Sequence, residues 1–84
     1  MKYCLITFRS VTPAQRAERL LHRRGYTCTL QRTPKWMEIQ GCGYSLRIFH
    51  RDAPSCIAFL NEEEIPYQKV YLMLESGVTE ELNL

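Results

Sequence analysis

The chain lacks the cysteine spacing of a metal site, although it contains four cysteines in 84 residues. They are Cys4, Cys28, Cys42 and Cys56. No CxxC motif occurs, and neither histidine stands at a ligand-like spacing from a cysteine. This argues against a zinc ribbon or an iron–sulfur site, and we predict no metal or other cofactor. Two disulfides are possible by count, but a cytoplasmic chain disfavours them.

Long apolar runs, a signal peptide and a large net charge are missing as well. The chain passes from Met1 directly into an apolar alternating segment, without the three regions of a secretory signal. No run approaches the length that spans a bilayer. The net charge of +2 is too small to predict a nucleic-acid partner by itself. We therefore expect a soluble, cytoplasmic, single-domain protein without membrane contact, and we regard nucleic acid as an improbable partner.

The polar and apolar residues that are present indicate four strands and two helices. Alternation predicts strands over residues 2–8 and 44–49, and the Tyr and Thr content predicts one over residues 26–32. Pro66 opens a fourth strand that runs to Leu74. A helix is expected after a hydroxyl cap at Ser10 or Thr12, and Gly25 stops it. A second helix follows Asp52 as its cap.

The order strand–helix–strand–strand–helix–strand predicts an α+β fold. Two right-handed crossovers give a ferredoxin-like βαββαβ sandwich, with a four-stranded antiparallel sheet and both helices on one face. We assign residues 1–74 to this domain and residues 75–84 to a loose C-terminal tail. The residues expected to face the helices are Cys4, Ile6, Leu46, Ile48, Val70 and Leu72. The opposite face is then left bare and carries Tyr3, Leu5, Phe49, Tyr71 and Met73, a patch that suggests a protein interface or a homodimer.

One cysteine stands apart from the others because it lies between two glycines. Gly41-Cys42-Gly43 precedes an apolar strand, in a connection that runs from Lys35 to Gly43. Glycine on both sides lets a partner approach the sulfur closely, and it allows backbone N–H groups to favour the thiolate. The other three cysteines fall on inward or nearly inward faces and are expected to pack in the core.

The N-terminal pattern and this glycine-flanked cysteine together resemble the small selenium/sulfur carrier protein-like family, long described as of unknown function. The matching N-terminal residues are Tyr3, Thr7-Phe8, Ser10, Thr12, Ala14, Ala17-Glu18, Leu21 and Gly25. Gly41-Cys42-Gly43, with Tyr44 opening the next strand, is similar to the Cys-Gly signature of the family, and the resemblance extends to about Leu74. It implies a carrier in sulfur or selenium metabolism that holds the atom on Cys42 as a persulfide or selenopersulfide. Its partners would be a cysteine desulfurase-like donor and an acceptor protein.

The family usually has small serine-like residues just before the cysteine. Pro34-Lys35 matches the proline and basic residue of the family, but Ile39-Gln40-Gly41 replaces the small polar run. Hydroxyl groups that could hydrogen-bond a persulfide are therefore absent from this segment.

Three basic side chains, those of Lys35, Arg47 and His50, could lower the pKa of the Cys42 thiol. The chemistry of a carrier needs an exposed thiolate and little else, so we expect a carrier more than a turnover enzyme.

The alternative function is an RNA-binding or protein-interaction module. It would use the aromatic side chains of the open sheet face, including Tyr3 and Phe49, because the same fold serves RNA-recognition motifs. A measurement of thiol reactivity distinguishes the carrier hypothesis from this alternative.

Overall fold

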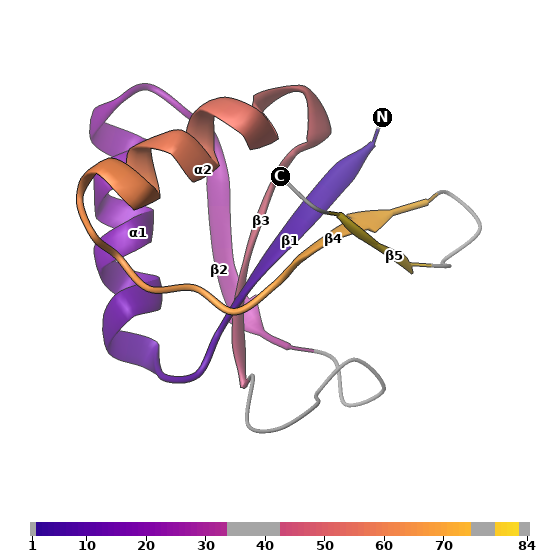
Figure 1. The fold of residues 1–84 in the computed structure, drawn as a ribbon, viewed down its shortest axis with the longest axis horizontal. Helices are drawn as coiled ribbons and strands as arrows, with labels where there is room; N and C mark the ends of the chain where they lie inside the picture. Colours follow the sequence, from indigo (N-terminus) through magenta and orange to yellow (C-terminus); the bar gives the residue numbers. More distant parts are fainter. Residues whose placement is uncertain (1, 34–42, 75–78, 83–84) are drawn as a thin grey trace.

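A five-stranded antiparallel sheet forms one layer of the protein, and two helices form the other. The computed structural model describes residues 2–33, 43–74 and 79–82. The strands are β1 (Tyr3–Phe8), β2 (Cys28–Arg32), β3 (Tyr44–Phe49), β4 (Val70–Met73) and β5 (Thr79–Leu82). Their order in the sheet is β2-β3-β1-β4-β5, with every neighbouring pair antiparallel (Figure 1). The helices are α1 (Val11–Arg23) and α2 (Ala53–Glu62), and a short 3-10 turn, η2 (His50–Asp52), leads into α2.

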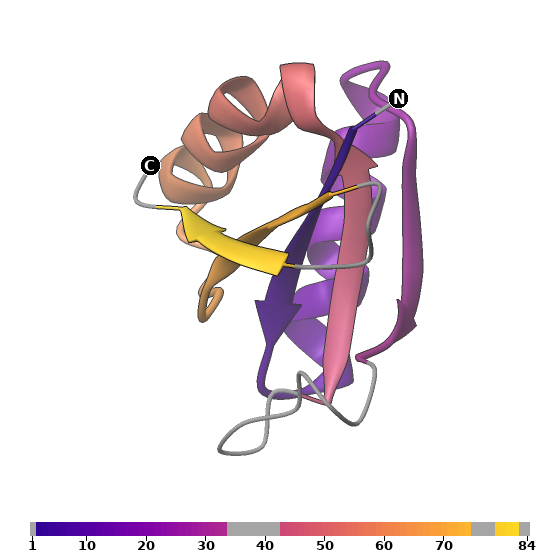
Figure 2. The ribbon, with the colours of Figure 1, turned by 90° about the vertical axis from the view of Figure 1, so that its right-hand side faces the viewer.

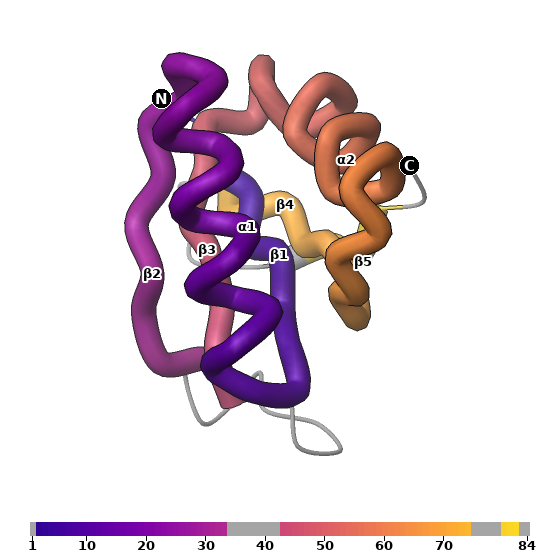
Figure 3. Tube along the Cα trace, turned by 90° about the vertical axis from the view of Figure 1, so that its left-hand side faces the viewer, coloured from indigo at the N-terminus to yellow at the C-terminus, as the bar shows by residue number. Residues whose placement is uncertain are grey.

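Both helices cover the same face of the sheet, where α1 contacts α2 (Figure 3). The sheet twists strongly, so β4 and β5 run obliquely to β2 and β3 (Figure 2). The six residues predicted to face the helices all belong to the apolar core between the layers. That part of the sequence prediction is confirmed, because alternation along a strand assigns successive side chains to opposite faces.

Helix α1 begins and ends where its sequence changes. Ser10 is the N-cap residue, but its hydroxyl makes no capping hydrogen bond, so it acts through its extended backbone alone. Small and branched apolar residues recur along the inner side of the helix, which buries Ala14, Ala17, Leu20 and Leu21. Gly25 adopts the left-handed conformation with φ of 87°, and its N–H donates to the His22 carbonyl at 3.0 Å. Glycine is therefore required by the backbone at this position.

Helix α2 starts from the η2 turn rather than from a side-chain cap. Asp52 occupies the N-cap position without a side-chain capping bond, so the cap expected there from the sequence does not form. A proline in the first turn lacks only an N–H that would have no partner within the helix. At the other end, Glu64 takes a left-handed φ of 56° and Ile65 donates to the Leu60 carbonyl at 2.9 Å. Ile65 is thereby turned back into the core.

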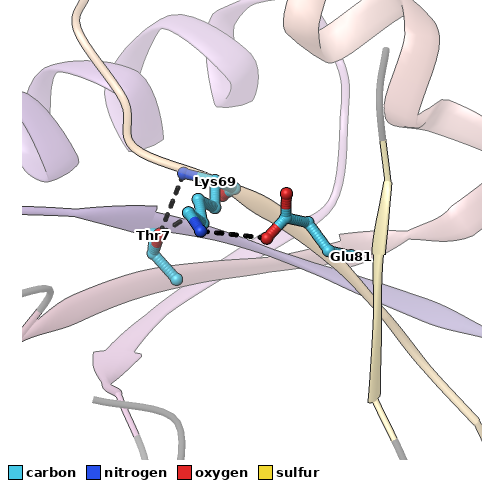
Figure 4. A network of polar contacts seen from close by, with 3 residues as sticks. All are labelled: Thr7, Lys69 and Glu81. Carbon is cyan, nitrogen blue, oxygen red and sulfur yellow. Dashed lines mark hydrogen bonds and ion pairs between the residues drawn. The ribbon is translucent and has the colours of Figure 1, made fainter. Parts of the chain in front are cut away.

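The fifth strand, β5, corrects two predictions, because the sheet has five strands rather than four and residues 79–82 do not belong to a loose tail. Sequence reasoning missed β5 because Thr79-Glu80-Glu81-Leu82 shows no apolar alternation. Its backbone instead pairs with β4, and the Lys69 ammonium lies 3.0 Å from a Glu81 carboxylate oxygen (Figure 4). The main chain of Lys69 also bonds the hydroxyl of Thr7, which ties this edge to β1.

The sequence predicted a bare sheet face opposite the helices. The structure corrects this prediction, because several side chains on that face are buried. Leu5 points to this face but is only 1% exposed, and its cross-strand neighbours there are Arg47 and Tyr71. Thr7 and Ser45, further along the same face, are also buried. β1 therefore buries side chains on both sides of the sheet, and Leu5 cannot serve as an exposed contact in this conformation.

Leu5→Ala is expected to destabilise the protein by about 2–5 kcal/mol, because the substitution leaves a cavity at a buried position. Met73→Ala, on the half-buried end of the same face, is the matched control and should cost less. Urea unfolding followed by circular dichroism measures both. A Leu5→Ala loss below about 0.5 kcal/mol, as for a surface site, would contradict the burial of Leu5.

Candidate functional site

Gly43, the last residue of the predicted Gly41-Cys42-Gly43 site, lies at the end of the sheet where β3 begins. Cys42, Gly41 and Lys35 are outside the described residues. Gly43 is described, and its carbonyl accepts the N–H of Thr33 at 3.0 Å, which extends the β2–β3 ladder by one residue. Apart from its two chain neighbours, no described heavy atom lies within 4 Å of the position that a Cβ on Gly43 would occupy, and its φ is not left-handed. The fold therefore does not require glycine here, and there is open space beside the backbone.

Two arginines that sequence reasoning did not select lie at the same end of the sheet. Phe8 pairs with Tyr44, so Arg9 and Ser10 leave β1 beside the start of β3. The Arg32 guanidinium lies 5.1 Å from the centre of the Tyr44 ring and donates to its hydroxyl at 3.3 Å. The strand register identifies this neighbourhood, and a single sequence does not give that register.

A pocket of about 350 Å³ opens next to the start of α1. Its lining residues are Arg9, Ser10, Pro13, Pro66, Tyr67 and Gln68. The pocket lies at the same end of the molecule as Gly43, since it begins where β1 ends.

Arg47 and His50, two of the expected thiolate stabilisers, are engaged elsewhere. The Arg47 guanidinium lies 4.9 Å from the centre of the Tyr3 ring on the outer face. His50 follows the far end of β3, seven residues after Gly43 and thus roughly 23 Å away at ~3.3 Å per residue. The structure therefore does not bring His50 to the Gly43 end of the sheet.

His50 instead contacts a core thiol, a pair that sequence reasoning missed. Its Nδ1 lies 3.3 Å from the Cys4 sulfur, although 46 residues separate the two in the chain. The main chains are joined at the same place, since the His50 N–H donates to the Lys2 carbonyl at 3.0 Å. Burial raises the pKa of the Cys4 thiol, so the thiol stays protonated and its S–H can donate to Nδ1.

Two of the four residues predicted as a partner interface, Tyr3 and Phe49, stack on each other. Their ring centres lie 5.4 Å apart. The Arg51 guanidinium lies 5.0 Å from the centre of the Phe49 ring, and the Arg47 guanidinium lies over the Tyr3 ring in the same way. Tyr3, Phe49 and Tyr71 are half-buried, whereas Leu5 is buried. Three of the four predicted residues therefore remain reachable by a partner at their edges.

One family model, described as "Putative Se/S carrier protein-like", matches residues 3–72. The chain belongs to this family. The match confirms the resemblance seen in the N-terminal pattern and in the Cys-Gly segment. No curated protein and no solved structure matches the chain significantly.

In this family member, the three described cysteines are buried and free of disulfides. Burial, helped by the charge of Glu18, raises the pKa of Cys28 from 9.0 to about 11. Burial raises the pKa of Cys56 to about 12, with further contributions from Asp52, Cys28 and Cys4. All three are therefore neutral thiols at physiological pH, which makes them poor nucleophiles.

Within the part of the chain that is described, no group of three or more potential ligand side chains could hold a metal ion. The helices described here are also too short or too polar to cross a membrane.

The folded protein should react with iodoacetamide at Cys42 much faster than at any other cysteine near pH 7.5. The reason is that burial and a raised pKa protect Cys4, Cys28 and Cys56. Peptide mapping after limited alkylation identifies the labelled site, and urea-unfolded protein, in which all four thiols should react, is the control. Preferential labelling of a core cysteine in the folded state would show that Cys42 is not the reactive thiol.

The free energy of unfolding should fall as the pH rises from about 9 toward about 11. Over this range the unfolded chain loses thiol protons at the ordinary pKa of 9.0, whereas folded Cys28 keeps its proton up to about 11 and Cys56 up to about 12. The unfolded state then binds fewer protons than the native state, so stability declines with pH. Urea melts at about pH 8 and about pH 10 measure the change, and Cys28→Ala should show a smaller decline than the wild type.

Proposed function

We propose that the protein carries a sulfur or selenium atom on Cys42, as a persulfide or selenopersulfide, and passes it between protein partners. The observation that carries the proposal is the burial of the other cysteines within a chain that belongs to the Se/S carrier-like family. With three of the four thiols neutral and enclosed, Cys42 is left as the candidate for chemistry with another macromolecule.

The transfer step needs a thiolate and a donor persulfide. The Cys42 thiolate attacks the terminal sulfur of the donor, a new S–S bond forms to Cys42, and the S–S bond of the donor breaks. The electron pair of that bond leaves with the donor thiolate, so no external oxidant or reductant is consumed. The reverse reaction, with an acceptor thiolate as the nucleophile, delivers the atom. The donor loads Cys42 and the acceptor unloads it, so the protein only holds the atom between the two reactions. In this role it is a carrier more than a turnover enzyme.

The open space beside Gly43 supports an encounter of this kind. Apart from its chain neighbours, a Cβ at Gly43 would meet no described heavy atom within 4 Å, so a partner can come close to the backbone there. Gly41 would extend the same access to the other side of Cys42. Lys35 remains a candidate stabiliser of the thiolate, whereas Arg9 and Arg32 are better supported than Arg47 or His50 because they lie at the Gly43 end of the sheet.

The partners we propose are proteins, namely a persulfide donor such as a cysteine desulfurase and an acceptor. The half-buried rings of Tyr3, Phe49 and Tyr71 offer an edge for docking or for a homodimer. RNA binding through this face receives less support. The rings of Tyr3 and Phe49 stack on each other, and two arginine side chains already lie over them.

For the fold, we propose that β1 to β4 with both helices form a ferredoxin-like sandwich to which β5 is added. The strand order β2-β3-β1-β4 and the antiparallel pairing support this assignment. We also propose a cytoplasmic location, where a reducing environment keeps the four cysteines free.

Cys42→Ser should abolish persulfide formation and leave the fold intact, with a stability change within about 0.5 kcal/mol. Wild-type protein incubated with a cysteine desulfurase and cysteine should gain the mass of one sulfur atom on the Cys42 peptide. Cys28→Ala is the control, because it removes a buried thiol and should still load. The carrier function would be excluded if the wild-type protein gained no sulfur in this assay and no selenium in the matching assay with a selenium donor.

A further inference from the structure

Basic residues surround a small cavity at the corner of the sheet where β1 begins and β3 ends. The cavity has a volume of about 170 Å³, and its lining residues are Lys2, Phe49, His50 and Arg51. The strand register brings these two segments together, because Tyr3 pairs with Phe49. The His50 N–H also donates to the Lys2 carbonyl at 3.0 Å. The main chain therefore holds two of the basic residues, Lys2 and His50, next to each other.

His50 contributes a hydrogen-bond donor that the fold does not use. Its Nδ1 lies 3.3 Å from the sulfur of the neutral Cys4 thiol and accepts the S–H. A neutral imidazole that accepts at Nδ1 carries its proton on Nε2. Among the described residues, no acceptor bonds to His50 Nε2. Since His50 lines the cavity, this N–H is available to a ligand there.

The positive charges at this corner are not neutralised by acidic side chains. Lys2 and Arg47 are exposed, and no carboxylate in the described part of the chain pairs with either of them. Arg51 has the Asp52 carboxylate as a neighbour, but the closest atoms are 3.9 Å apart and the Arg51 side chain is 72% exposed. A surface pair of this kind contributes little and leaves the cation accessible. The corner is thus positive, although the net charge of the chain is only +2.

Two of these cations are held in place by aromatic rings. The Arg47 guanidinium lies 4.9 Å from the centre of the Tyr3 ring, and the Arg51 guanidinium lies 5.0 Å from the centre of the Phe49 ring. The two rings stack on each other, so both arginines flank the same stack. A guanidinium has five N–H donors in a fixed plane and pairs well with carboxylates. Positioned arginines therefore favour a ligand that carries carboxylate groups.

The size of the cavity indicates which part of such a ligand enters it. A cavity of about 150 Å³ can hold benzene, so this one has room for one large apolar side chain. Phe49 gives the cavity an apolar wall. Lysine and arginine pack their aliphatic stems along apolar groups and keep their charged ends in water. An apolar anchor between carboxylates matches both the wall and the surrounding charge.

A protein segment fits this surface better than RNA does. Single-stranded RNA binds through bases that stack on open aromatic faces. Here the Tyr3 and Phe49 rings already contact each other, and each ring also contacts a guanidinium. An acidic peptide needs no free ring face, because its carboxylates pair with N–H donors.

We propose that this cavity docks an acidic segment of a partner protein, which places one large apolar side chain in the cavity. Carboxylates beside that side chain would pair with Lys2, Arg47 and Arg51. The inference rests on the proposed function, because the partner would be the donor or the acceptor of the carried atom. It identifies the chemistry of the surface by which that partner is recognised.

The test is an NMR titration at low salt with the peptide Glu-Asp-Leu-Asp-Glu, blocked at both ends. Lys2→Ala/Arg51→Ala should bind this peptide about fivefold more weakly than the wild type, because two exposed charge contacts are lost. The variant keeps the backbone bond between positions 2 and 50, so the cavity remains formed. A peptide with alanine in place of leucine should also bind more weakly, since it lacks the apolar anchor.

Three controls separate a local site from a general effect of charge. Arg16→Ala/Arg19→Ala removes the same charge from the exposed side of α1 and should bind the peptide like the wild type. The neutral peptide Gln-Asn-Leu-Asn-Gln should bind much more weakly. The ring signals of His50 should shift during the titration, whereas those of His22, which contacts the Cys28 carbonyl at 3.1 Å, should not.

The inference would be overturned if the wild type did not bind the acidic peptide, or if both double variants were weakened equally. A uridine oligonucleotide that binds more tightly than the peptide, and that loses this binding in Lys2→Ala/Arg51→Ala, would assign the cavity to nucleic acid instead.

The carrier function is tested separately by loading without a partner protein. Sodium tetrasulfide transfers one sulfur atom to the Cys42 thiolate and releases trisulfide, and mass spectrometry detects the product. A wild-type protein that loads but does not bind the peptide would overturn the docking inference alone. A wild-type protein that does not load would overturn the carrier function, while the peptide titration would still decide whether the cavity binds an acidic segment.

Discussion

The structure depends on the central position of β1, which must bury side chains on both faces of the sheet. Its inner face supplies Cys4, Ile6 and Phe8 to the core beneath the helices. Its outer face buries Leu5 and Thr7 against β3 and β4. Because β1 pairs with both of these strands, its register fixes where each begins and ends. The Phe8–Tyr44 pair brings the start of β3 beside the start of α1, and the Tyr3–Phe49 pair brings His50 to Cys4.

This register separates the described cysteines, which are buried, from the start of β3. At one end, Cys4 is enclosed with His50, and Cys28 and Cys56 are buried in the same core. At the other end lie Gly43, Arg9 and Arg32. The raised pKa values of the core thiols follow mainly from desolvation by burial. The three described cysteines are thereby kept as neutral thiols away from the Gly43 end.

Much of the fold was predictable from the sequence because its signals are local. Apolar alternation located β1 and β3, and Gly25 marked the end of α1. β5 was not predictable, since Glu80 and Glu81 interrupt any alternation and its stability comes from backbone pairing with β4. The burial of Leu5 and the Cys4–His50 contact also depend on pairing between distant segments, which a single sequence does not reveal. For the same reason the position of Arg9 and Arg32 near Gly43 could not be predicted, whereas proximity in sequence favoured Arg47 and His50.

The exposed edge of β5 has a consequence for how the protein behaves at high concentration. An edge strand presents unpaired backbone groups that can recruit the edge of another molecule. In β5, Glu80 and Glu81 are both exposed and stand next to each other. Bringing two such edges together would place like charges side by side, which opposes the growth of a continuous intermolecular sheet. The two glutamates of β5 therefore disfavour strand-by-strand association through this edge.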